Sequence, residues 1–221
     1  MNAAPQPEPL FEVSDLRVAF GRHGQFHDAV RGISLSVNPG EVLGIVGESG
    51  SGKSVGMLAS IGLQSANARV SGSVRFRGRE LIGLPARELR KLRGARIGMI
   101  FQDPLSSLNP VMTIGSQLAE AVLLHNRDMS GKAAMDRARD LLALVAIPQP
   151  DRRLHQYPHE FSGGMRQRVM IAMAVANDPD LLIADEPTTA LDVTVQAQIM
   201  EVLSGLQERL GLGLILITHD L

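Results

Sequence analysis

The sequence predicts an α/β fold built on a mainly parallel sheet, and three observations lead to that prediction. Short apolar runs typical of buried strands occur at 42–46, 96–101, 181–184 and 214–217. Helical patterns separate the later runs, and strands that alternate with helices favour parallel pairing. A glycine-rich segment directly follows the first run, as it does where a buried strand leads into a phosphate-binding loop. The 221 residues suffice for one large domain.

The N-terminal part has a different pattern. Apolar and polar residues alternate at 11–20 and at 33–37, which predicts two half-buried strands. A turn at 38–40 leads into the apolar run that precedes the glycine-rich segment. Residues 72–78, bounded by glycines, predict a further strand that is exposed.

Helical patterns fill most of the remaining chain. From 113 to about 145 the pattern is helical, and Pro148 and Pro150 end it. One face of this stretch carries Met135, Ala138, Leu141, Leu142 and Val145. A second helical run covers 165–176, and an apolar stripe predicts a third helix at 195–210.

Composition excludes several classes of protein. The formal net charge is −1, so no global field favours nucleic acid or an anionic membrane. There are no cysteines, which excludes disulfides, thiolate zinc sites and cysteine nucleophiles. No apolar run reaches the roughly 18 residues of a membrane span, and residues 1–10 lack the features of a secretory signal. We therefore expect a soluble, cytosolic chain whose membrane role, if it has one, comes through a partner.

A basic cluster at 87–96 could contact nucleic acid. It has no interleaved aromatic residues, and such residues are what single-stranded nucleic acid stacks on. The pattern therefore favours a solvated helix face, and we expect no nucleic-acid partner.

Residues 47–54 fit the G-x-x-x-x-G-K-[ST] phosphate-binding pattern without a mismatch. The segment consists of Gly47, Glu48, Ser49, Gly50, Ser51, Gly52, Lys53 and Ser54. Glycines let the backbone curl around a polyphosphate, and a helix beginning near Ser54 adds the positive end of its dipole. Lys53 can reach the β- and γ-phosphates, and the Ser54 hydroxyl can bind Mg²⁺.

Two carboxylates follow the apolar run at 181–184. Strand ends of open α/β sheets are where ligands bind, so Asp185 and Glu186 are candidate site residues. The first acid suits a water-mediated contact to Mg²⁺, and the second can orient or deprotonate an attacking water. A helix-capping acid pair is the alternative interpretation.

Three weaker candidates accompany them. Gln102 ends the run at 96–101 and can offer its amide oxygen to a metal or a water. His219 ends the last strand and can donate to a γ-phosphate, although a lone histidine is more often structural. The segment 162–164 opens a helical run, where it forms either a second anion site or an ordinary helix cap.

The order of these groups resembles the ATP-binding subunits of ABC transporters, from about residue 10 to the last residue. Within that family, residues 47–54 look like the Walker A loop, Gln102 like the Q-loop glutamine and His219 like the switch histidine. Asp185 and Glu186 resemble the Walker B aspartate and the catalytic glutamate. The remaining matches are Ser162, Gly163 and Gly164 with the signature loop, and Thr189, Ala190, Leu191 and Asp192 with the D-loop.

The resemblance implies a role for each of these residues. ATP contacts would come from residues 47–54, from Asp192, and from Phe20 through a stack on adenine, with Phe26 and His27 as nearby alternatives. The signature residues would contact the ATP of a partner subunit. Catalytic roles would fall to Glu186, His219 and Gln102, and Mg²⁺ contacts to Ser54, Gln102 and Asp185.

The resemblance also implies the domain organisation. We expect a single ABC ATPase domain over residues 1–221, with a P-loop NTPase core, an N-terminal antiparallel β subdomain and an inserted helical subdomain. The expected boundaries are 10–40 and 70–80 for the antiparallel part, 41–69, 94–103 and 163–221 for the nucleotide-binding core, and 104–162 for the helical subdomain.

The sequences of the segments 101–104, 107–110, 113–115, 157–161 and 185–196 are similar to those of the ATPases of dipeptide, oligopeptide and nickel importers. This resemblance implies an ATP-hydrolysing subunit with ATP and Mg²⁺ that powers the import of peptides or a related small solute. Its partners would be transmembrane permease subunits, a second identical or paralogous ATPase subunit bound head to tail, and indirectly a solute-binding protein. It would lie peripherally on the cytoplasmic face of the cell membrane.

Other members of the superfamily are the alternatives. An exporter ATPase would share the same motifs, whereas DNA-repair ATPases carry a long coiled-coil insertion that the interval 102–162 lacks. A catalytically silent subunit would lack Lys53, Glu186 or His219, and all three are present.

The chain departs from the family pattern in two places. Met165 stands where the signature usually has glutamine, while the serine and glycines before it are retained. The sequence also ends two residues after His219, where related ATPases continue with further strands and helices. We therefore expect a C-terminally truncated fold with an uncovered sheet edge.

Overall fold

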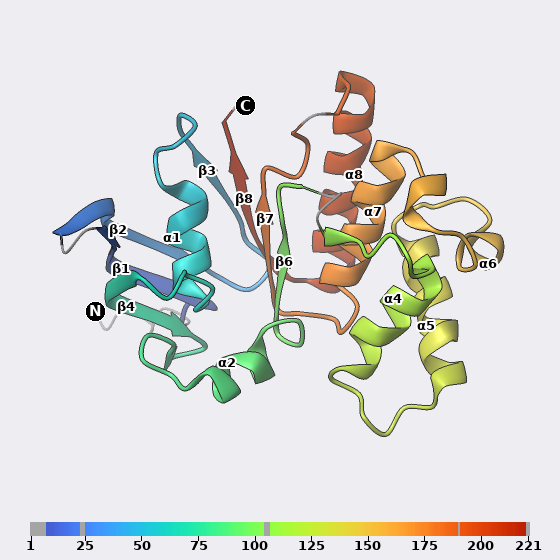
Figure 1. Ribbon diagram of the computed structural model, residues 1–221, viewed down its shortest axis with the longest axis horizontal. Helices are drawn as coiled ribbons and strands as arrows, with labels where there is room; N and C mark the ends of the chain where they lie inside the picture. Colours follow the sequence, from blue (N-terminus) through green and yellow to red (C-terminus); the bar gives the residue numbers. More distant parts are fainter. Residues whose placement is uncertain (1–7, 23–24, 104–106, 190, 220–221) are drawn as a thin grey trace, which may run out of the picture.

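The computed structural model describes residues 8–22, 25–103, 107–189 and 191–219, which form two four-stranded sheets (Figure 1). The first sheet is antiparallel and has the order β2-β1-β4-β5. Its strands are β1 (Phe11–Arg22), β2 (Gln25–Val37), β4 (Ala68–Phe76) and β5 (Arg79–Glu80). The second sheet is parallel and has the order β3-β8-β7-β6. Its strands are β3 (Val42–Val46), β6 (Ile97–Ile100), β7 (Leu181–Asp185) and β8 (Gly213–Thr218).

Helices lie on both faces of the parallel sheet. In Figure 1, α1 lies between the two sheets, α7 and α8 lie on the far side of the parallel sheet, and α4, α5 and α6 form a lobe beyond α7. The helices are α1 (Lys53–Ser60), α2 (Ala86–Leu92), α4 (Ile114–Leu123), α5 (Gly131–Leu144), α6 (Pro150–Arg153), α7 (Gly163–Ala174) and α8 (Val193–Leu210). A 3-10 turn, η1 (Pro158–Glu160), precedes α7.

The central strand β7 explains how the two cores are joined. All five of its residues are buried, and its side chains alternate between two apolar clusters. Leu182 and Ala184 belong to the cluster shared with the helices α4, α5, α7 and α8. Leu181 and Ile183 belong to the cluster between the sheets, which includes Met57 of α1. A strand covered on both faces reads as a continuous apolar run, as the sequence predicts.

The prediction that the strand at 42–46 is buried is wrong. Val42 and Val46 are 53% and 47% exposed. The strand lies at the edge of the parallel sheet, and only its inward-facing Leu43 and Ile45 pack against the cluster between the sheets. The run is apolar on both faces, but the described part of the chain covers one face only.

The helical stretch predicted at 113–145 is two helices rather than one. The structure ends α4 at Leu123 and begins α5 at Gly131. Both starts are capped: Thr113 accepts a hydrogen bond from the backbone N–H of Ser116, and Ser130 accepts one from that of Ala133. The predicted apolar face is correct, because Ala138, Leu141, Leu142 and Val145 are buried. None of the described helices is long and apolar enough to cross a membrane.

Candidate functional site

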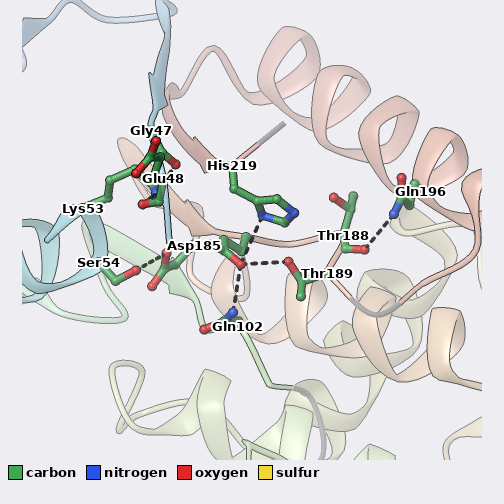
Figure 2. A network of polar contacts seen from close by, with 11 residues as sticks. Gly47, Glu48, Lys53, Ser54, Gln102, Asp185, Thr188, Thr189, Gln196 and His219 are labelled. Atoms are coloured by element: carbon green, nitrogen blue, oxygen red, sulfur yellow. Dashed lines mark hydrogen bonds and ion pairs between the residues drawn. The ribbon is translucent and has the colours of Figure 1, made fainter. Parts of the chain in front are cut away.

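Candidate residues from four segments of the chain gather at the carboxyl edge of the parallel sheet (Figure 2). The glycine-rich loop follows β3, and Asp185 is the last residue of β7. Gln102 and His219 come just after β6 and β8. Parallel strands bring their carboxyl ends to one edge, so four segments distant in sequence meet there. Hydrogen bonds and one ion pair link several of these residues to one another.

The loop before α1 surrounds the Lys53 ammonium with backbone oxygens. Its Nζ donates to the carbonyl oxygen of Gly47 at 2.5 Å and to that of Glu48 at 2.8 Å. Gly52 caps α1 with a φ of 92°, in the left-handed region. A Cβ on Gly52 would lie 2.5 Å from the carbonyl oxygen of Ala29, so only glycine fits there.

Replacing Gly52 with alanine should lower the free energy of unfolding by about 2 kcal/mol or more, because backbone strain and a backbone clash add. Gly205, on an exposed part of α8, is the matched control, because a Cβ there meets nothing within 4 Å. Gly205→Ala should leave stability unchanged or raise it by up to about 1 kcal/mol. Urea denaturation of both variants measures the difference. Equal midpoints would contradict the conclusion that only glycine fits at position 52.

Ser54 and Asp185 join the first helix to the central strand. The Ser54 hydroxyl donates to Asp185 Oδ1 at 2.7 Å. Asp185 is only 5% exposed, and this burial raises the pKa of its carboxyl. The hydrogen bond from Ser54 and the charge of Lys53 lower that pKa, whereas the charge of Glu186 raises it.

The donor set at this point fits a hard divalent cation. A hydroxyl and a carboxylate oxygen 2.7 Å apart match the oxygen ligands that Mg²⁺ takes. Among the described residues, there is no group of three or more His, Cys, Asp or Glu that could hold a metal alone. The site therefore suits an ion that takes its remaining ligands from water and from phosphates.

The raised pKa of Asp185 predicts how the stability of the protein depends on pH. A carboxyl whose folded pKa is raised costs stability once it is deprotonated, and this cost disappears below the unfolded pKa of about 3.9. Asp185→Asn should therefore be more stable than the unsubstituted chain at pH 7, and the difference should shrink as the pH falls toward about 4. Denaturation of the ligand-free proteins across this range tests it, with exposed Asp128→Asn as control. Equal stability at pH 7 would refute the argument.

Glu186 accepts three contacts on a single carboxylate oxygen, Oε2. Gln102 Nε2 donates at 2.8 Å, Thr189 Oγ1 donates at 2.9 Å, and His219 Nδ1 lies at 3.5 Å. The Glu186 side chain is 11% exposed, and its backbone has a φ of 46°. The dashed lines from Gln102, Thr189 and His219 in Figure 2 meet at this oxygen.

The signature segment lies apart from this network. Ser162 caps α7 by accepting from the backbone N–H of Met165, and Asp192 caps α8 in the same way from Val195. The two helix starts pack together, since a Cβ on Gly164 would lie 2.5 Å from Val195 Cγ1. Within the described ranges, no hydrogen bond or ion pair joins Ser162 or Asp192 to Lys53 or Glu186. The sequence reasoning found these residues, but the single chain does not bring them to the carboxylates.

The aromatic candidates differ in their surroundings. Phe20, on β1, is partly buried and packs against the cluster between the sheets. Phe26 is 42% exposed, and the guanidinium of Arg69 lies 3.6 Å from the centroid of its ring. His27 pairs with Phe20 across β1 and β2 and is exposed. One face of Phe26 is therefore already covered by a cation.

Two residues of the site were missed by the sequence analysis. Thr189 was quoted only as part of a motif, although its hydroxyl contacts Glu186. Gln196, on α8, donates from Nε2 to the carbonyl oxygen of Thr188 (Figure 2). It also donates to that of Leu191, and so holds the turn that carries Thr189. The spacing of three residues from Glu186 to Thr189 is the signal that could have suggested the contact. Pro104 and Ala190, which belong to the quoted motifs, lie outside the described residues.

The basic cluster also has a setting that the sequence did not predict. A groove of about 1270 Å³ lies between α2, β6 and α4, lined by Arg87, Arg90, Arg93 and Arg127 together with apolar Phe101 and Leu124. Arg87 and Arg90 are exposed, as expected for a solvated helix face, and they also border this groove. A groove lined by arginines and apolar side chains suits an amphipathic segment that carries acidic residues.

Comparison with known proteins agrees with this geometry. The family model for ABC transporters matches residues 30–189. The chain is 57% identical over 213 residues to the oligopeptide transport ATP-binding protein OppD of Mycobacterium tuberculosis, covering 96% of this chain and 35% of that protein. It is 53% identical over 219 residues to OppD of Escherichia coli K12, covering 99% of this chain and 65% of that protein. The chain thus spans about a third and just under two thirds of these relatives.

Solved structures share the fold. The ATP-binding cassette MJ0796, in a dimeric post-hydrolysis state bound to ADP and Pi, is similar with a TM-score of 0.83 and 30% identity. The likeness covers 95% of this chain and 88% of that one. cbiO1 from Clostridium perfringens, part of an ABC transporter complex, has a TM-score of 0.78 and 27% identity over 96% of this chain and 79% of that one.

Proposed function

The chain belongs to the ABC transporter family, and we propose that it binds and hydrolyses ATP to power the import of peptides or a related small solute. The observation that carries this proposal is the meeting of the Lys53 loop, the Ser54–Asp185 pair and Glu186 at one edge of the sheet. Phosphoryl transfer from a nucleotide needs this combination of anion binding, metal binding and a positioned carboxylate.

Residues 47–54 would bind the phosphates of ATP. The backbone N–H groups at the start of α1 would donate to the phosphate oxygens, and the helix dipole would favour the anion. Lys53 would exchange its two backbone carbonyl partners for phosphate oxygens. Ser54 and Asp185, with the amide oxygen of Gln102, would hold Mg²⁺, which would neutralise charge on the β- and γ-phosphates. Phe20 would stack on adenine.

Glu186 would orient the attacking water and accept its proton. Its carboxylate is held by Gln102, Thr189 and His219, so its position is fixed before the nucleotide binds. His219 would also donate to the γ-phosphate, next to the water that Glu186 orients. This arrangement supplies orientation and electrostatic stabilisation, which dominate phosphoryl transfer.

A second ATPase subunit would complete the site. Ser162 and Asp192 cap α7 and α8, and among the described residues no hydrogen bond or ion pair joins either of them to the carboxylates of Asp185 or Glu186. In a head-to-tail dimer they would face the ATP bound by the partner subunit. The dimeric, nucleotide-bound state of the similar MJ0796 cassette supports this arrangement. The second subunit would be an identical or a paralogous ATPase.

Permease subunits would dock beside this site, on the segment from Asp103 to Val122. The arginine-lined groove next to α4 supports such a docking surface, and Gln102 would link it to the nucleotide. The chain would then lie peripherally on the cytoplasmic face of the cell membrane, with a solute-binding protein acting through the permease. The similar OppD proteins are described as oligopeptide transport proteins, which supports a peptide as the solute.

Light scattering after size exclusion tests the proposal on the variant Glu186→Gln with MgATP and separately with MgADP. A dimer that forms with MgATP only, together with phosphate release by the unsubstituted chain, is the expected result. A chain that neither binds MgATP nor releases phosphate would overturn the proposed function. Uptake of a labelled oligopeptide by cells that produce the unsubstituted or the Lys53→Ala chain tests the solute.

A further inference from the structure

One carboxylate oxygen carries all the polar contacts that the structure gives the Glu186 side chain. Oε2 receives Gln102, Thr189 and His219, and no hydrogen bond or ion pair among the described residues involves Oε1. The two oxygens are therefore unequal: one is anchored and the other is left for a water. A carboxylate fixed by one oxygen keeps the direction of the other.

The three side chains that contact Oε2 also differ in the roles that the proposed function gives them. Gln102 and His219 come from segments after β6 and β8, and both have a second partner once nucleotide is bound. Thr189 has no such second role. It belongs to the same turn as Glu186, because its N–H donates to the Glu186 carbonyl oxygen at 3.2 Å.

We propose that Thr189 is a positioning residue whose hydroxyl fixes the Glu186 carboxylate so that Oε1 faces the attacking water throughout turnover. The inference rests on the proposed function. Because the contact lies within one turn, it persists when Gln102 and His219 engage metal and phosphate. Among the described residues, the only hydrogen bond of the Thr189 hydroxyl is the one to Glu186, so its effect on turnover passes through that carboxylate.

The turn that carries Thr189 is itself anchored at two points. The Glu186 N–H donates to the carbonyl oxygen of Ile217 in β8 at 3.0 Å, which holds the left-handed backbone of Glu186. Gln196 donates to Thr188 O at 3.3 Å and to Leu191 O at 3.0 Å, tying the turn to α8 (Figure 2). The hydroxyl is therefore presented from a backbone fixed by β8 and α8, as a positioning contact requires.

The first experiment compares Thr189→Val with Thr189→Ser. Valine keeps the shape but removes the hydroxyl, and serine keeps the hydroxyl. We expect Thr189→Val to lower kcat for MgATP by about tenfold or more, as for losing a hydrogen bond to a charged group, while KM stays within about twofold. Thr189→Ser should retain most of kcat. Thr188→Val is the matched control, because within the described ranges the Thr188 side chain makes no hydrogen bond.

The outcomes separate positioning from mere stability. A loss shared by serine and valine, or a rise in KM equal to the fall in kcat, would overturn the proposal in favour of a packing role. Unchanged kcat in Thr189→Val would overturn it outright. A wild-type chain without turnover would count against the proposed function, and the contact would then be decided by the measurement below.

The second experiment needs no hydrolysis. Melting temperatures of the ligand-free wild type, Thr189→Val, Glu186→Ala and the double variant form a double-mutant cycle. If the hydroxyl acts on the carboxylate, the fall in melting temperature caused by Thr189→Val should shrink by at least half once Glu186 is alanine. Equal falls in both backgrounds would show that Thr189 does not act through Glu186, and would overturn the proposal whatever the turnover of the chain.

Discussion

Replacing Glu186 with glutamine should leave ATP binding intact and lower turnover by at least about a hundredfold, the usual size of a lost general base. Glutamine keeps the shape of the side chain and an oxygen that can accept from Thr189. It removes the negative charge that accepts the proton of the attacking water. Phosphate release at saturating MgATP measures turnover, and equilibrium titration with a fluorescent ATP analogue measures binding.

A glutamate elsewhere provides the control for this experiment. Glu208 is exposed on α8, far along the helix from Asp192, and Glu208→Gln should leave both turnover and binding unchanged. Wild-type turnover in Glu186→Gln would show that another group activates the water. A loss of binding equal to the loss of turnover would assign Glu186 to the binding of nucleotide instead.

The position of the Glu186 carboxylate can be predicted from the sequence, because parallel strands place their carboxyl ends at one edge of the sheet. An apolar run that ends in two acids places them at the carboxyl edge, and the loop after β3 must reach the same edge. Gln102 and His219 could be placed there on the same grounds. The site is therefore readable wherever its residues directly follow strands.

The sequence does not reveal what depends on local turn geometry or on neighbouring layers. The contact of Thr189 with Glu186 requires the left-handed backbone of Glu186, which no sequence pattern announces for a glutamate. The exposure of Val42 and Val46 depends on which layers cover β3. The interruption between α4 and α5, in contrast, coincides with four successive polar residues at 125–128 and with the cap residue Ser130, so the sequence does carry a signal for it that the predicted single stretch overlooked.

The groove beside α2 is a surface feature that the sequence does not reveal. Its arginines come from α2 and from the segment after α4, more than thirty residues apart in the sequence, and only folding brings Arg90 and Arg127 to one concave surface. A linear cluster of charge is commonly a solvated helix face. The arginines of α2 are exposed as that interpretation predicts, and the second wall, with Phe101 and Leu124, makes their surface concave.

The last prediction concerns the lysine of the phosphate-binding loop. Lys53→Ala should weaken the binding of MgATP by roughly 10- to 100-fold, which corresponds to losing a charge-assisted hydrogen bond of about 1.5–3 kcal/mol. The ammonium is held at the start of α1 by the carbonyl oxygens of Gly47 and Glu48, so it already lies where the phosphates are expected. Isothermal titration with a slowly hydrolysed ATP analogue and Mg²⁺ measures the change.

The control for this variant is a lysine of equal charge on a different surface. Lys132 is exposed near the start of α5, and Lys132→Ala should leave the affinity unchanged.

Because Lys53 also bridges two carbonyl oxygens of its own loop, its removal frees those groups and lets the loop relax. Lys53→Arg separates the two effects: it keeps the charge but not the compact ammonium that the loop encloses. Weak binding in both Lys53→Arg and Lys53→Ala would assign the loss of affinity to the changed shape of the phosphate-binding loop. Recovery of affinity in Lys53→Arg would assign it to the lost charge. Unchanged affinity in Lys53→Ala would refute the assignment of the loop as the phosphate site.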